Sequence, residues 1–238
     1  MIKLDALKVA LRFYRIPITD KQLLRFTHFA QQLLNANNRH NLISKHDEHD
    51  LVMRHFVDSI LLLGLDGFRK RVADEVLDVG SGAGFPGIPL KICLPDTRIT
   101  LLDSQRKRTA FLKKITRELG LSMVEVIWDR LGTVALQERL AGKFGVIITR
   151  AVEDFEAVLR NSLPLLSCNG ILVFYKGKLN KKELHIINHH LDFSTFRYEL
   201  VTLMLPPGFP YQRYFLVIRK NTDTSELLGS GFNVHGSG

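Results

Sequence analysis

The chain has 238 residues, a length that suits one large domain with an additional segment better than two domains of equal size. Hydrophobic residues make up 45% and charged residues 24%, which excludes a collagen-like, low-complexity or wholly disordered chain. The 33 Lys and Arg exceed the 24 Asp and Glu, and the net charge is +9. This excess favours a polyanionic partner such as nucleic acid or an anionic membrane surface.

The sequence predicts neither a membrane anchor nor a disulfide framework. Its longest uncharged stretch, residues 161–175, is shorter than the ~20 residues that a membrane helix needs, and Pro164 interrupts it. The two cysteines, Cys93 and Cys168, have no CxxC spacing and are expected to be thiols in a reducing compartment. The N-terminus lacks the apolar core of a signal peptide. We therefore expect a cytoplasmic protein without a membrane partner or a metal site.

The first 65 residues are predicted to form a helical extension. Apolar residues recur at helical spacing from Leu4 to Tyr14. A second helix is expected to begin at the N-cap pair Thr19-Asp20 and to be broken by residues 35–39. A third helix is predicted over residues 48–63.

From residue 72, short β-branched runs alternate with helical segments, a pattern typical of βαβ units and a parallel sheet. Helices are expected between the strands, most clearly over residues 105–119 and 154–163. Two late runs follow one another without a helix and predict an antiparallel pair at one end of the sheet. The predicted strands cover residues 76–79, 99–102, 124–128, 146–149, 171–175, 196–203 and 215–218.

These patterns divide the chain into three parts. Residues 1–65 form the helical extension, and residues 66–220 form an α/β domain. Residues 221–238 are rich in Gly and Ser and are predicted to be a flexible tail. The pattern does not set the oligomeric state, and a monomer is favoured.

The most informative segment runs from Val76 to Gly87 and reads VLDVGSGAGFPG. It is an apolar strand that ends in glycines, which allow close backbone approach to a ligand, and it then enters a helix. Pro86 fits near the helix start, where its missing N–H is not needed. A glycine loop at the carboxyl end of a first strand is the usual nucleotide-binding crevice of an open α/β sheet.

Two ligands fit this loop, and a loop without a ligand is the third possibility. Gly82-x-Gly84-x-x-Gly87 matches the dinucleotide fingerprint, with Asp103 as the acidic residue about 20 positions on. The acidic-x-Gly-x-Gly-x-Gly pattern that begins at Asp78 suits S-adenosylmethionine instead. Asp78 would then interact with the ammonium group, and Asp103 would accept hydrogen bonds from the ribose hydroxyls. The late antiparallel strands favour this second ligand, because a seventh, antiparallel strand is typical of methyltransferase sheets.

Several motifs together resemble one family. They are Asn41-Leu42-Ile43-Ser44, Arg54-His55-x-x-Asp58-Ser59, Leu77 to Leu90 with its specific Gly84-Phe85-Pro86-Gly87-Ile88-Pro89 string, Leu101-Leu102-Asp103-Ser104, Lys107-Arg108-x-x-Phe111-Leu112, Thr149-Arg150-Ala151 and Tyr175-Lys176-Gly177. Over residues 38–220 the chain is similar to the bacterial small-subunit rRNA guanine-N7 methyltransferases, also called glucose-inhibited division protein B. The resemblance implies a seven-stranded Rossmann-like sheet and S-adenosylmethionine as methyl donor. It also implies one guanine of 16S rRNA as acceptor, in naked rRNA or in the small ribosomal subunit.

The resemblance also implies which residues bind the cofactor. Carried over to this chain, the family positions fall on Gly80, Phe85, the pair Leu131-Gly132 and Arg150. Related sequences often have an acidic residue where this chain has Gly132, so a contact there would use the backbone. Phe85 would touch the cofactor, stack on a base or only pack. Arg150 would face the crevice or form a structural salt bridge.

The chemistry needs no general base. Guanine N7 carries a lone pair and no proton, so methyl transfer depends mainly on proximity and orientation. Arg54 and His55 are therefore candidates for substrate positioning rather than for proton transfer. Arg54 and Asp58 are spaced i, i+4, and they either form a surface ion pair or flank the mouth of the site. Lys176 and Lys178 follow the fifth predicted strand and either contact RNA or lie in a solvated loop.

The predicted helix over residues 105–117 holds six basic residues and no acidic one. Its Arg106, Lys113 and Arg117 fall within about 40° of one another around the helix axis. This stripe is either the solvated face of an amphipathic helix or a phosphate-binding surface. Two rival functions remain, a non-catalytic RNA-binding protein and a dinucleotide-dependent oxidoreductase. The intact glycine loop and its acidic partners argue against the first of them.

Overall fold

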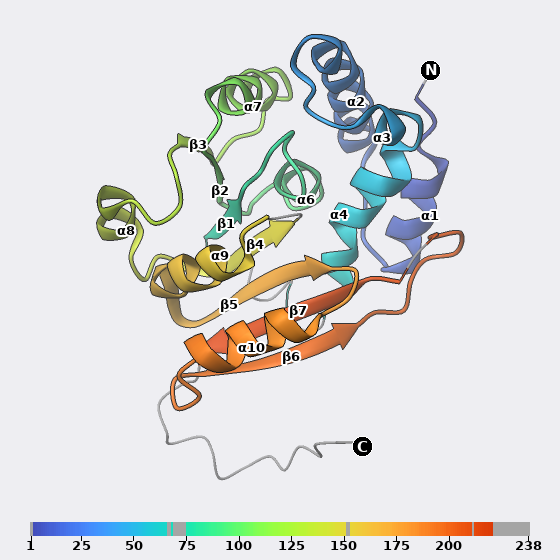
Figure 1. Ribbon diagram of the computed structural model, residues 1–238. Helices are drawn as coiled ribbons and strands as arrows, with labels where there is room; N and C mark the ends of the chain where they lie inside the picture. The colour runs from blue at the N-terminus through green and yellow to red at the C-terminus, as the bar shows by residue number, and fades with distance from the viewer. Residues whose placement is uncertain (1, 66–67, 69–74, 151–152, 211, 221–238) are drawn as a thin grey trace.

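The computed structural model describes residues 2–65, 68, 75–150, 153–210 and 212–220 (Figure 1). Within them, seven strands form one mixed sheet in the order β3-β2-β1-β4-β5-β7-β6. Strands β1 to β5 run parallel, and β7 is antiparallel to both β5 and β6. The predicted α/β class and the antiparallel pair at one end of the sheet are confirmed.

The strands alternate with helices as the pattern predicted. The strands are β1 (Val76–Val79), β2 (Ile99–Asp103), β3 (Val124–Trp128), β4 (Phe144–Arg150), β5 (Leu166–Lys176), β6 (Phe196–Thr202) and β7 (Tyr214–Lys220). The helices that connect them are α6 (Gly87–Cys93), α7 (Arg106–Glu118), α8 (Val134–Leu140), α9 (Phe155–Ser162), followed by the 3-10 turn Leu163–Leu165, and α10 (Lys181–His190).

Strand β5 begins earlier than predicted. Leu166 already pairs with Phe144 of β4, and the register then shifts before Val146 pairs with Ile171. Asn169 has a φ of 64° and Gly170 follows it, so this part of the strand has the composition of a turn. The predicted start at residue 171 is wrong, because pairing with β4 extends the strand through residues whose composition favours a turn.

Helices α1 (Asp5–Phe13) and α2 (Asp20–His40) precede the sheet, and α2 starts where the sequence predicted. Thr19 accepts a hydrogen bond from the backbone N–H of Gln22 in a capping box. The predicted break at residues 35–39 is wrong, because α2 continues to His40. The buried amide of Asn37 accepts from the N–H of Ile43 and donates to its carbonyl, so the following loop satisfies a side chain that would otherwise disfavour the helix.

The third predicted helix, over residues 48–63, is not one regular helix. It consists of α3 (Lys45–His49), a π-helical turn over Val52–Val57, α4 (Asp58–Ile60) and a 3-10 turn over Leu61–Gly64. Successive segments have different helical periods, so residues spaced i, i+4 by number do not share one face. The ring of Tyr14 lies against Gly64, where an added Cβ would come within 2.5 Å of it.

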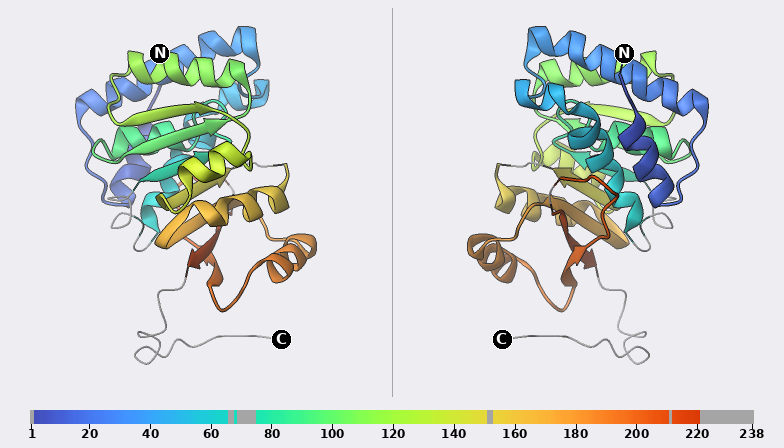
Figure 2. Two further views of the ribbon diagram at one scale, coloured as in Figure 1. Left: turned by 90° about the vertical axis from the view of Figure 1, so that its left-hand side faces the viewer. Right: turned by 90° about the vertical axis from the view of Figure 1, so that its right-hand side faces the viewer.

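The sheet is covered by helices on both faces (Figure 2). One hydrophobic cluster joins Leu7 of α1 and Phe26 of α2 to strand residues such as Val146. The second cluster joins α8, α9 and α10 to the alternate residues of the same strands, among them Ile147. Successive strand residues point to opposite faces, so the parallel strands are apolar on both sides. The N-terminal helices therefore share a continuous core with the sheet.

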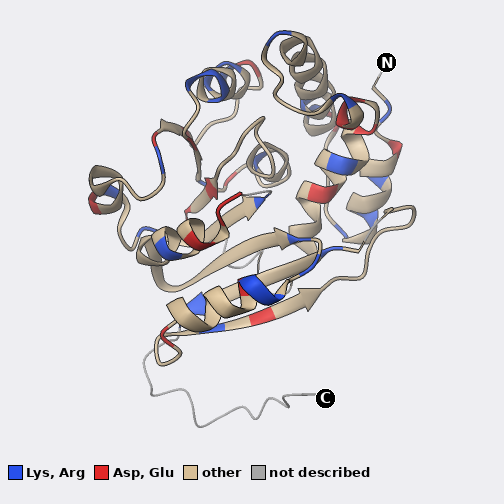
Figure 3. Ribbon diagram, in the orientation of Figure 1, with Lys and Arg blue, Asp and Glu red and all other residues tan. Residues whose placement is uncertain are grey.

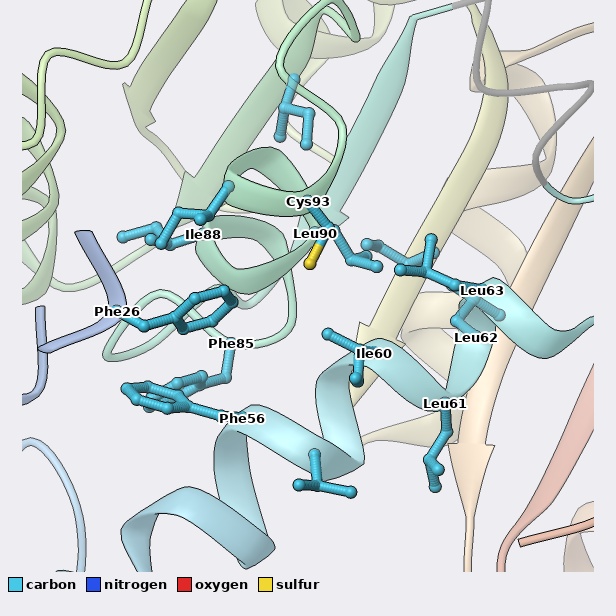
Figure 4. Packing of buried hydrophobic residues seen from close by; sticks show 14 of the residues in the cluster. Phe26, Phe56, Ile60, Leu61, Leu62, Leu63, Phe85, Ile88, Leu90 and Cys93 are labelled. Carbon is cyan, nitrogen blue, oxygen red and sulfur yellow. The ribbon is translucent and has the colours of Figure 1, made fainter. Parts of the chain in front are cut away.

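A cluster of aromatic rings packs the N-terminal helices against the glycine loop. Phe56 is fully buried, and its ring centroid lies 5.1 Å from that of Phe26 and 5.6 Å from that of Phe29. The ring centroid of Phe85, in the glycine loop, lies 5.4 Å from that of Phe29 and 6.1 Å from that of Phe56. Figure 4 shows Phe85 beside Phe26 and Phe56. The position of the loop after β1 is thus coupled to the packing of α2 and the π-helical turn.

No helix in the described parts of the chain combines the length and the apolar character needed to cross a membrane. Those same residues contain no group of three or more His, Cys, Asp or Glu side chains that could hold a metal ion. The tail predicted over residues 221–238 lies outside the described residues.

Replacing Phe56 by alanine is expected to lower the free energy of unfolding by about 3–5 kcal/mol, because it removes a buried ring and leaves a cavity between three others. Urea denaturation monitored by circular dichroism measures the change. Phe193, which is 51% exposed, provides the control, and Phe193→Ala should change stability by no more than about 0.5 kcal/mol. Equal effects of the two substitutions would contradict the packing described here.

Candidate active site

The chain leaves β1 at Val79 and turns through a glycine loop, residues 80–87, into α6. Gly80, Gly82 and Gly84 have φ values of 71°, 58° and 100°, a left-handed region that favours glycine. At Gly84 an added Cβ would also come within 2.4 Å of the side chain of Ile88. Pro86 is the residue that caps α6, so the predicted helix start after the glycines is confirmed.

Asp78, in β1, anchors the end of the glycine loop through a hydrogen bond. Its side chain is fully buried, and Oδ2 accepts a hydrogen bond from the backbone N–H of Gly87 at 3.0 Å. A Cβ on Gly87 would lie 2.7 Å from this oxygen, so the loop can approach the carboxylate only as glycine. Burial raises the pKa of Asp78 to about 7, against the Gly87 hydrogen bond, which lowers it. The second oxygen, Oδ1, is buried and has no hydrogen-bond partner among the described residues.

Asp103, at the end of the neighbouring strand β2, is hydrogen-bonded to the middle of the glycine loop. It ends β2, as the sequence predicted, and only 3% of it is exposed. Its Oδ2 accepts from the N–H of Gly82 and its Oδ1 from the N–H of Gln105, both at 2.8 Å. The Arg108 guanidinium lies 3.8 Å from Oδ2. The carboxylate is therefore fixed in orientation, and each oxygen has capacity for a further hydrogen bond.

A cavity of about 670 Å³ opens over the carboxyl ends of β1, β2, β3 and β4. This volume lies in the range of sites for small molecules and cofactors. Of the predicted cofactor residues, the lining contains Gly80, Asp103, Leu131 and Arg150. Asp78, Gly82, Gly84, Phe85 and Gly132 are not among the lining residues. Gly82 and Gly84 belong to the glycine loop behind the cavity lining, and Asp78 supports that loop.

Sequence reasoning missed several polar residues of the cavity. They are Ser104, Gln105, Arg108, Asp129, Arg130, Glu153, Asp154 and Asn161. Most of them directly follow β2, β3 or β4. The carboxyl ends of parallel strands meet at one edge of the sheet, and this rule would have found them.

The segment after β3 is shaped by its own hydrogen bonds. Asp129 accepts from the N–H of Arg130 at 2.7 Å and from the hydroxyl of Thr133 at 3.2 Å. Gly132 has a φ of 95°, and a Cβ there would lie 2.8 Å from the side chain of Asn161 on α9. Close approach by α9 therefore requires glycine at this position, and Leu131 is the member of the pair that reaches the cavity.

The expected i, i+4 ion pair between Arg54 and Asp58 does not form, and the surface-pair interpretation is wrong. Arg54 pairs instead with Asp47, its Nε 2.6 Å from Oδ1. Asp58 is 1% exposed and holds two other arginines, with Oδ2 2.9 Å from Nη1 of Arg150 and Oδ1 2.7 Å from Nε of Arg213. The π-helical turn between residues 52 and 57 separates the two side chains, and Asp58 faces the interior.

Arg150 lies at the centre of this arrangement. Besides its ion pair with Asp58, its Nη2 lies 2.7 Å from Nδ1 of His55, and its Cζ lies 5.2 Å from the centre of the Phe85 ring. Both expected roles are therefore found together, since Arg150 faces the cavity and forms a buried salt bridge. Phe85 packs against the stacked His55 ring, with centroids 4.5 Å apart.

His55 is held in its neutral form. Burial, and then the Arg150 charge, lower the pKa of His55 to about 3, although Asp47 opposes the shift. A guanidinium is always a donor, so Nδ1 accepts from Arg150 and the proton lies on Nε2. The imidazole thus helps to orient Arg150, and the substrate-positioning role expected for His55 stays a prediction.

The remaining candidates lie outside the cavity. Lys176 pairs with Glu183 of α10 and lies 4.9 Å from the centre of the Phe155 ring, while Lys178 is exposed. Arg106, Lys113 and Arg117 are all exposed on α7, the helix on which Figure 3 marks the Lys and Arg segments in blue. The structure therefore confirms the solvated stripe and leaves RNA contact as a proposal.

The fold and the cavity define the class of protein. A glycine loop after β1 and an acidic residue at the end of β2 are shared by several nucleotide-binding sheets. The antiparallel strand β7, inserted between β5 and β6, is the feature typical of Rossmann-like methyltransferases.

Comparison with known proteins gives the family. Residues 22–206 match the model of the GidB family, rRNA small subunit methyltransferase G, and the chain belongs to this family. The ribosomal RNA small subunit methyltransferase G of Carboxydothermus hydrogenoformans is 34% identical over 220 residues, which cover 92% of each chain. That of Pelotomaculum thermopropionicum is 31% identical over 222 residues, covering 93% of this chain and 92% of the relative.

The fold is also found in a solved structure. Cofactor-bound Rv0187 from MTB superposes with a TM-score of 0.55 at 15% identity, covering 84% of this chain and 90% of that one. Family membership decides against the dinucleotide-dependent oxidoreductase that the glycine pattern alone left open.

Asp103→Ala is expected to weaken binding of S-adenosylmethionine at least about tenfold, because lost hydrogen bonds to a charged group cost about 1.5–3 kcal/mol. Isothermal titration calorimetry measures the dissociation constant. Glu125, an exposed acid on β3, provides the control variant Glu125→Ala, which should bind as the wild type does. An unchanged dissociation constant for Asp103→Ala would remove this residue from the cofactor site.

His55 should make the protein sensitive to acid. Its folded-state pKa is depressed, so the unfolded chain takes up a proton below about pH 6.5 that the folded chain does not. Between pH 7 and pH 5 the wild type should therefore lose about 2 kcal/mol of stability relative to His55→Gln. Urea titrations at both pH values measure the difference. Parallel losses in the two proteins would show that His55 is not buried as a neutral ring.

Proposed function

We propose that this protein transfers a methyl group from S-adenosylmethionine to N7 of a guanine in small-subunit rRNA. One observation carries the proposal. Gly80 and Arg150, at positions implied by the family resemblance, and Asp103, the acidic partner of the glycine loop, converge on one cavity at the carboxyl ends of the parallel strands. Membership of the rRNA small subunit methyltransferase G family supports the reaction and the class of acceptor. An rRNA substrate would place the activity in the cytoplasm, on naked rRNA or on the small ribosomal subunit.

The residues fit S-adenosylmethionine. Asp103 is fixed by two backbone donors and retains acceptor capacity, which suits the two ribose hydroxyls. The left-handed glycines bring the main chain of Gly80 to the cavity wall without a side chain. Asp78 lies behind the loop and does not line the cavity, so in this proposal its unpartnered oxygen interacts with the ammonium of the methionine part through water. In this proposal both carboxylates act through charge and hydrogen bonding, not as bases.

The reaction needs orientation more than proton transfer. When bound, S-adenosylmethionine supplies a sulfonium methyl group, and the N7 lone pair forms the new N–C bond while the C–S electron pair stays on sulfur. No proton leaves, and the positive charge passes to the purine. Arg150, fixed by Asp58 and His55, would order the rim at which the guanine enters. Arg54, locked to Asp47 beside it, would have the same positioning role.

The rRNA would be held by exposed cations. Arg106, Lys113 and Arg117 form one side of α7, and this helix also supplies Arg108 to the cavity. Lys178 is exposed after β5. We propose that these residues contact phosphates, in keeping with the net charge of +9. Lys176 is already paired with Glu183, and it would reach RNA only by exchanging that partner.

The acceptor atom is tested by replacing the target guanine with 7-deazaguanine, which puts carbon at the position of the nucleophile. We expect RNA binding to stay within about tenfold, the loss of one hydrogen bond, while methyl transfer disappears. Nucleoside mass spectrometry detects the product, and the unsubstituted RNA is the control. Continued methylation of the substituted base would show that another atom is the acceptor. Binding without methylation of the unsubstituted RNA would instead favour a non-catalytic RNA-binding protein.

A further inference from the structure

The only tryptophan of the chain, Trp128, is an exposed aromatic side chain held in a fixed position. It is the last residue of β3 and is 56% exposed. Its indole Nε1 donates a hydrogen bond to the backbone carbonyl of Ser104, at 3.1 Å. An indole anchored through its only donor presents a ring surface to solvent without the freedom of an unattached side chain.

The indole stands at the rim of the proposed cofactor cavity. Its anchor, Ser104, and its chain neighbour, Asp129, both line that cavity. Ile127 points into the hydrophobic cluster of α8 and α9, so Trp128 points to the opposite face of the sheet, where α7 lies. Helix α7 and β3 are neighbours at one end of the molecule (Figure 1).

One cation of α7 lies against this ring, and others follow it along the helix. The guanidinium carbon of Arg106 lies 5.6 Å from the indole centroid, within the range of a cation–π contact. From Arg106 to Arg117 the helix carries six cations and no acid. A rigid aromatic surface beside a row of cations matches single-stranded nucleic acid, in which bases stack and phosphates pair with cations.

A second cavity continues the basic surface along the same helix. It has a volume of about 750 Å³ and lies between α2 and α7. Its lining includes Arg39, His40, Lys107 and Lys114, and no Asp or Glu is among the described residues that form it. Helix α7 therefore borders both cavities. A single strand of nucleic acid that follows the exposed side of the helix would meet cations near both cavities.

We propose that Trp128, together with Arg106, is a stacking platform for one unpaired base of the rRNA substrate beside the methylation site. The proposal rests on the proposed function and specifies how its substrate is held. The base on the platform is a neighbour of the acceptor guanine rather than the acceptor itself, because the platform lies outside the cavity lining. Stacking suits this role because it fixes a splayed strand without needing a base-specific hydrogen bond.

The first test compares Trp128→Ala, Trp128→Phe and Phe193→Ala. Phe193 is an aromatic residue of similar exposure, 51%, next to the opposite end of the sheet, and it is the matched control. Trp128→Ala should weaken binding to protein-free 16S rRNA about tenfold, the loss expected for one stacked base. Trp128→Phe should retain most of the affinity, and Phe193→Ala should retain all of it. Binding of S-adenosylhomocysteine, measured by calorimetry, should be unchanged in all three variants.

The second test locates the stacked base. In a synthetic 16S fragment that contains the acceptor guanine, abasic sites are placed one at a time. One position should weaken binding of the wild type about tenfold and should not weaken Trp128→Ala further, because the two changes remove the same contact. Since Trp128 is the only tryptophan, the intact fragment should quench the intrinsic tryptophan fluorescence, and the fragment abasic at that position should not.

Several outcomes would overturn the platform. Equal RNA affinity of wild type and Trp128→Ala would remove Trp128 from the interface, and loss of S-adenosylhomocysteine binding would assign it to the cofactor. A defect seen only with assembled small subunits would point to a ribosomal protein as its partner. If Trp128→Ala does not fold, the abasic series and the fluorescence of the wild type still show whether Trp128 stacks on a base. Failure of the wild type to methylate rRNA would instead contradict the proposed function, and the two failures are distinct.

Discussion

The buried carboxylate of Asp58 joins three parts of the chain that are distant in sequence. Its oxygens bind Arg150 at the end of β4 and Arg213 just before β7, while its own backbone belongs to the helical segment that precedes the sheet. Loss of one partner from a buried ion cluster typically costs about 3–5 kcal/mol, because the other charges stay desolvated. The helical segment, the cavity rim and the antiparallel end of the sheet are therefore positioned by one side chain.

The glycine loop depends on two further carboxylates. Asp78 binds the Gly87 N–H from beneath, and Asp103 binds the Gly82 N–H from the neighbouring strand. Phe85 leaves the same loop on its other side and enters the aromatic cluster of the N-terminal helices. A loop held from three directions is preorganised, so cofactor binding does not have to order it. The N-terminal helices thus support the loop through packing, and His55 contacts both Phe85 and the cavity residue Arg150.

Helix α7 buries one side in the core and exposes the other. Phe111 and Ile115 lie in the core, Arg108 borders the cofactor cavity, and the outward cations remain exposed. The same helix approaches Trp128 through Arg106. Cofactor and nucleic acid would therefore meet on opposite edges of a single element, whose position is fixed by its packing on the sheet.

The sequence by itself determined the α/β sheet, the bounds of β1 and β3, the glycine loop with Asp103 beside it, and the family resemblance. These features depend on local periodicity and on short spacings, which a single chain displays directly. Only the tertiary structure decided that α2 continues through Asn37, that Asp58 leaves Arg54 for Arg150 and Arg213, and that His55 is neutral. Those outcomes depend on contacts between residues far apart in sequence and on desolvation, and neither is written in the local pattern.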